Sequence, residues 1–231
     1  MATGATRVEL ARELRTAMCV DRGFTMHRED DGYLFRKTVE GEQFSAILEI
    51  LADLVLTYDE LRLTGVASLA VPALQDAVDA VPEAAVSNFD LHTGRPYSTE
   101  IAIESFGRRG SFGGSEQEIL IETDDDIGPA VEEFVEIVDG PVEAWVAARL
   151  QIQPLIDGVV SEDSHSHPQF VRRLILLLLL LHRADDAVQV MDAHLGAKLH
   201  LGERESRAPK FEQHLLDSSD AYRRAREIAH A

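Results

Sequence analysis

A strongly acidic segment, residues 116–143, constrains the fold more than any other part of the sequence. Between Arg109 and Arg149 there is no Lys or Arg, but there are eleven carboxylates: Glu116, Glu118, Glu122, Asp124, Asp125, Asp126, Glu132, Glu133, Glu136, Asp139 and Glu143. The same segment contains a strand pattern at 118–122, followed by a helical pattern whose inner face is Val131, Phe134, Val135 and Val138. We therefore predict a folded strand and helix with an acidic surface, rather than a disordered acidic tail.

The negative charge is concentrated in the first two thirds of the chain. Of the formal net charge of −19, residues 1–155 contribute −17 from 29 acidic and 12 basic residues, and residues 156–231 contribute −2 from 12 and 10. Such a field repels the phosphate backbone of nucleic acids and accelerates encounter with a cationic surface. We expect a basic protein partner and no nucleic acid. Solubility alone is an alternative explanation of the charge.

Composition and apolar runs indicate an intracellular globular protein. Hydrophobic residues make up 45% of the chain, which is ordinary for a globular domain. The lone Cys19 has no disulfide partner, as expected in a reducing compartment, and no signal-peptide pattern follows the N-terminus. The longest apolar run, Leu174–Leu181, is eight residues long, whereas a membrane span needs about 20. A cytoplasmic protein without membrane association is predicted.

The N-terminal region predicts a helix followed by a hairpin. Thr6 and Glu9 have the spacing of a capping box at the start of a helix over 6–18, and Gly23 suits its end. The apolar stripe of this helix is expected to be Val8, Ala11, Leu14 and Met18. Two strands, 24–29 and 33–39, flank an Asp-Asp-Gly turn in which Gly32 would accept a positive φ.

The next segments predict more strands and one short helix. Gln43–Leu56 fits either a helical face or a strand, and its position between strands favours a strand over Gln43–Leu51. Leu61–Leu69 is expected to be a strand and Val71–Val81 a helix ended by Pro82. Strands at 98–106 and 117–122 are expected to form a hairpin joined by the glycine-rich residues 107–115.

The C-terminal region reads as helical. We expect helices at 169–181, 184–195 and 210–230, with Phe211, Leu215, Tyr222 and Ile228 on the last, and a polar linker at 158–167. The predicted fold class is α+β: a mainly antiparallel sheet packed by helices in a domain of residues 1–157, then a helical part, 168–231.

Candidate chemistry is sparse, and we predict a non-catalytic protein without metal or cofactor. There is no Gly-x-Ser-x-Gly motif, and His27, His182, His194, His200 and His214 are scattered. His165 and His167 lie in one short polar loop with Glu162 and Asp163, which is expected to be a solvated linker rather than a zinc site. Arg108 and Arg109, between two glycines, offer an alternative function as an anion clamp in a ligand-binding protein or enzyme.

Three stretches carry a resemblance: RGFTMHREDDGYLFRK, LRLTGVASLAVPALQDAV and DDDIGPAVEEFVEIVDGPVEAW. Over about residues 7–155 they resemble a broad group of uncharacterised bacterial α+β proteins, often encoded beside polymorphic toxins and suspected to be immunity proteins. The group has no established catalytic residues to transfer. The resemblance implies a binding protein that covers a basic toxin surface.

We therefore predict a protein-binding protein, with a candidate partner-binding surface of seven carboxylates: Glu122, Asp124, Asp125, Asp126, Glu132, Glu133 and Glu136. Two other functions are kept as alternatives. One is anion or small-ligand binding through Arg108 and Arg109, and the other is an oligomeric scaffold built on the C-terminal helices.

Overall fold

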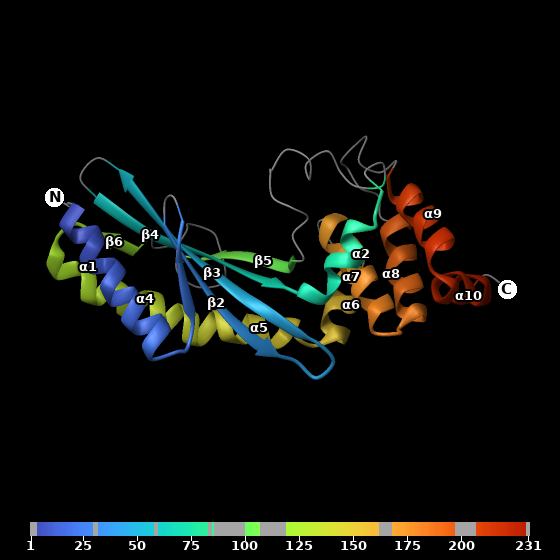
Figure 1. The fold of residues 1–231 in the computed structure, drawn as a ribbon, viewed down its shortest axis with the longest axis horizontal. Coiled ribbons are helices and arrows are strands. Elements are labelled where there is room, and N and C mark those ends of the chain that lie inside the picture. Colours follow the sequence, from blue (N-terminus) through green and yellow to red (C-terminus); the bar gives the residue numbers. More distant parts are fainter. Residues whose placement is uncertain are drawn as a thin grey trace. The chain divides into compact units, whose positions relative to one another are not determined.

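The computed structural model describes residues 4–29, 32–57, 60–82, 85, 100–106, 119–161, 168–196 and 207–229. Contacts divide the chain into two compact units, Met1–Ala70 with Ala102–Leu150, and Val71–Ile101 with Gln151–Ala231. The first unit, called the sheet unit, contains most of the sheet, and the second, called the helical unit, is mainly helical (Figure 1). The sequence predicts one boundary, a linker at 158–167. In the structure, the helical unit is built from two separate segments, Val71–Ile101 and Gln151–Ala231.

The sheet confirms the predicted α+β class. Its strands are β1 (Thr25–Arg28), β2 (Gly32–Glu40), β3 (Ser45–Thr57), β4 (Glu60–Ala70), β5 (Glu100–Phe106) and β6 (Ile119–Ile121). The order is β1-β2-β3-β4-β5, and β6 also pairs with β4. The pairs β1–β2, β2–β3, β3–β4 and β4–β6 are antiparallel. The segment that fitted both helix and strand is therefore a strand.

The predicted hairpin between the last two strands is wrong. Leu61 and Leu63 of β4 pair with Ile121 and Ile119 of β6, and β5 follows β4 in the strand order. β4 spans 11 residues, so its one free edge is long enough to pair with both short strands. A sequence pattern shows where strands begin and end, but it does not show which partner each strand takes.

The alternation of β3 explains why it is a strand. Ala46, Leu48, Ile50, Ala52 and Leu54 are all buried, whereas the residues between them are half-buried. Successive side chains of a strand point to opposite faces of the sheet. One face of the sheet therefore belongs to the core of this unit, where Phe35, Leu63 and Leu69 are also buried.

Two helical segments of the sheet unit pack side by side (Figure 1). The first is α1 (Gly4–Arg15) continued by the π-helix η1 (Thr16–Val20). The second is the 3-10 turn η5 (Asp124–Asp126), α4 (Ile127–Ile137), the π-helix η6 (Val138–Val142) and α5 (Glu143–Arg149). Gly140 and Pro141 lie inside η6, where proline would ordinarily break a helix, but the chain continues through them as a wider π-helical turn.

The first helix corrects two predictions. It starts at Gly4, so Thr6 lies inside the helix and does not cap it. Its buried stripe is Leu10, Leu14 and Met18, whereas Val8 is 71% exposed. The end of the helix follows the prediction, because Gly23 has a φ of 73° in the left-handed region.

The helical unit contains η2 (Pro72–Leu74), α2 (Gln75–Asp79), α6 (Ile152–Val160), α7 (Pro168–Leu180), α8 (Ala184–Gly196), α9 (Ala208–Ser218) and α10 (Asp220–Ala229). α7 and α8 form the predicted pair, joined at His182, whose φ of 59° lets Arg183 N donate to Leu178 O at 2.8 Å. The predicted final helix is instead two helices, and Ile228 is 75% exposed. Among the described helices, none is both long and apolar enough to span a membrane.

Candidate protein-binding surface

The seven predicted surface carboxylates lie on one continuous stretch of the sheet unit. Glu122 follows β6, Asp124, Asp125 and Asp126 form η5, and Glu132, Glu133 and Glu136 lie on α4. The opposite side of α4 is fixed in the core by Ile127, Ala130, Val131 and Phe134, all of which are buried. Packing of this apolar side determines which side chains of the helix point outward.

Asp126 has a structural role at the start of the helix. Its carboxylate accepts hydrogen bonds from the Thr123 backbone N–H at 2.8 Å, the Thr123 hydroxyl at 2.9 Å and the Glu122 backbone N–H at 3.1 Å. These donors, the Thr123 backbone first, hold the pKa of Asp126 below its ordinary value. Thr123 and Asp126 form a capping box, and this arrangement determines where the helical segment begins.

Asp124 links the two helical segments of this unit. The hydroxyl of Thr6, which is 1% exposed, donates to the Asp124 carboxylate at 2.6 Å. The predicted cap residue of the first helix therefore binds the start of the second. Because Asp124 and Asp126 are both engaged within the protein, they are weaker candidates for partner contact than the remaining five.

Those five carboxylates are the acidic face: Glu122, Asp125, Glu132, Glu133 and Glu136. Glu133 is half-buried and the other four are exposed. Within the part of the chain that the structure describes, their side chains form no hydrogen bond or ion pair. Glu132 and Glu136 are one helical turn apart, so their carboxylates share one side of α4.

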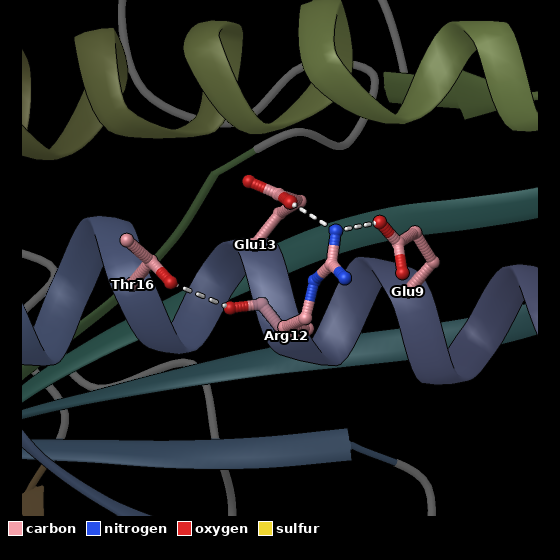
Figure 2. A network of polar contacts seen from close by, with 4 residues as sticks. All are labelled: Glu9, Arg12, Glu13 and Thr16. Carbon is pink, nitrogen blue, oxygen red and sulfur yellow. Dashed lines mark hydrogen bonds and ion pairs between the residues drawn. The ribbon is translucent and has the colours of Figure 1, made fainter.

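Two arginines of the same unit pair with carboxylates outside the acidic face. On α1, Arg12 lies between Glu9 and Glu13 and pairs with both (Figure 2). Arg36 pairs with Glu49 at 2.7 Å across β2 and β3. These pairs leave the acidic face without neutralisation by Arg12 or Arg36.

Asp139 is a third acidic residue of the segment that is bound within the protein. Arg22 binds it in a two-point ion pair, with Nε to Oδ1 at 2.7 Å and Nη2 to Oδ2 at 2.6 Å. The hydrogen bond from Arg22 is the main reason that the pKa of Asp139 is lowered. Counting carboxylates in the sequence could not show this pairing, since 117 positions separate the two residues.

The helical unit contains a polar cluster that the sequence did not reveal. His194 of α8 and Arg172 of α7 are each 5% exposed, and the Arg172 guanidinium lies 5.8 Å from the centre of the Phe211 ring. Burial, and then the positive charge of Arg172, lower the pKa of His194 to about 4. His194 is therefore neutral at pH 7. In the sequence it was indistinguishable from the exposed histidines.

Two other predicted candidates fall outside the described residues. Arg108 and Arg109 belong to residues 107–118, and His165 and His167 to residues 162–167. Among the residues that are described, no group of three or more His, Cys, Asp or Glu side chains is placed to hold a metal ion.

Comparison with known proteins gives no relative. No protein-family model matches the chain, and neither a curated protein nor a solved structure gives a significant match. Function must therefore be inferred from the geometry and charge of the surface itself.

Proposed function

We propose that this protein binds a basic surface of another protein through the acidic face of α4 and the turn before it. The observation that carries the proposal is that some of the described carboxylates of the sheet unit are paired with arginine and others are not. Glu132, Glu133 and Glu136 have no partner among the described residues, whereas Arg12 and Arg22 are paired with other acids.

The acidic face is presented by a rigid element. The buried side of α4 contains Phe134, which is 0% exposed, and the capping box fixes the start of the helix. Side chains held on a packed helix lose less entropy on binding than those on a loop. A net charge of −19 adds long-range attraction to a cationic partner and speeds the encounter.

The resemblance to suspected immunity proteins supports one version of this function. An immunity protein works by covering a toxin surface, which needs complementary charge and no catalytic groups. We propose that the partner is a basic toxin domain and that this protein acts by occlusion rather than by chemistry.

The test compares two variants with the same net charge. The face variant carries Glu132→Gln, Glu133→Gln and Glu136→Gln, and the control variant carries Glu29→Gln, Glu42→Gln and Glu227→Gln. All three control positions are exposed and lie outside α4. The probe is an oligolysine peptide, and its affinity is measured by calorimetry at several salt concentrations.

We expect the face variant to bind the peptide about tenfold more weakly at low salt, because each exposed ion pair contributes roughly 0.2–1 kcal/mol. Its affinity should also depend less steeply on salt. The control variant should lose less than about twofold. Equal losses in both variants would show that the peptide senses net charge alone and would overturn the proposal.

A further inference from the structure

We draw no further inference here: the strongest candidate, the half-buried apolar row Leu34, Leu51 and Val66 across strands β2, β3 and β4, carries none because nothing in the structure shows what covers it.

Discussion

Gly32 is required by the close approach of two strands. It pairs with Asp53, and a Cβ atom at this position would lie 2.1 Å from the carbonyl oxygen of Ala52. The predicted role, a positive φ in the turn, is wrong, because Gly23 is the only described glycine with a positive φ. The absence of a side chain, rather than backbone freedom, makes glycine necessary here.

Gly32→Ala should therefore destabilise the sheet unit by more than about 2 kcal/mol, because overpacking must displace backbone atoms. Urea unfolding followed by the fluorescence of Trp145, the chain's single tryptophan and part of the same unit, measures the change. The matched control is Gly158→Ala in α6, where a Cβ atom meets nothing within 4 Å. Far-UV circular dichroism should show the control unchanged or up to about 1 kcal/mol more stable. A Gly32→Ala protein as stable as wild type would contradict the close approach.

His194 predicts a loss of stability on the acid side of neutrality. Its folded-state pKa is about 4, against an ordinary value of 6.5. Below pH 6.5 the unfolded chain binds a proton at this residue more readily than the folded protein does. The free energy of unfolding is therefore unaffected by His194 above pH 6.5 and decreases as the pH falls from 6.5 to about 4. The loss from this residue should be about 3 kcal/mol once the pH is below the folded-state value.

Urea unfolding followed by circular dichroism across that pH window measures the effect. His194→Leu should flatten the pH dependence because it removes the buried titrating group, and His27→Gln, at an exposed position, is the control variant. If the free energy of unfolding of His194→Leu changed with pH as steeply as that of the wild type, the buried histidine would not be the source of the pH dependence.

At the scale of elements, the Arg22–Asp139 pair connects the end of one π-helix to another. Arg22 follows η1 and also donates to the carbonyl of Ala17 at 2.7 Å, while Asp139 lies in η6. The side chains are 23% and 44% exposed, so water weakens the attraction between them. The pair therefore contributes more to the register of the two segments than to total stability.

A double-mutant cycle with Arg22→Gln and Asp139→Asn should give a coupling of about 0.5–1 kcal/mol at neutral pH. Because the pKa of Asp139 is lowered on folding, the ionised carboxylate contributes its full share to the free energy of unfolding above the ordinary carboxyl value of 3.8. The contribution disappears as the pH falls through the lower folded-state value. Trp145 fluorescence in urea is the measurement, and a coupling that persisted after protonation would rule out an ionic origin.

Local patterns predicted the elements better than their contacts. The glycine at Gly23 depends on neighbouring residues and is predictable, whereas the segment that forms Ser45–Thr57 fits both a helix and a strand, and only its position between strands favours a strand. The spacing of Thr6 to Glu9 predicts a helix cap, but the Thr6 hydroxyl binds Asp124, which lies 118 positions away. No local pattern contains that information.

The division between the last two helices has a local signal in the sequence at Ser219. The hydroxyl of Ser219 accepts a hydrogen bond from the Tyr222 backbone N–H at 3.2 Å, as an N-cap residue does. Serine followed by Asp220 is a typical helix start, but the continuous charge pattern hid it. Within the acidic stretch, only the structure separates Asp124, Asp126 and Asp139, which are bound inside the protein, from the carboxylates without a partner among the described residues.

At the scale of the whole molecule, a net charge of −19 has two explanations, docking and solubility. The two explanations differ in whether the positions of the carboxylates on the surface matter. Repulsion between molecules depends mainly on total charge, because freely tumbling molecules approach one another in all orientations. Docking depends on where the carboxylates lie.

The face and control variants should therefore lose solubility to the same extent, because each removes three negative charges from the same total of −19. Precipitation by polyethylene glycol, at a pH just above the isoelectric point of about 4.8, measures this. Equal solubility combined with unequal affinity for the oligolysine peptide would separate the two explanations in favour of docking. If the face variant were the less soluble of the two, then the carboxylates of α4 would act mainly against self-association, and the loss of peptide binding would no longer identify a docking surface.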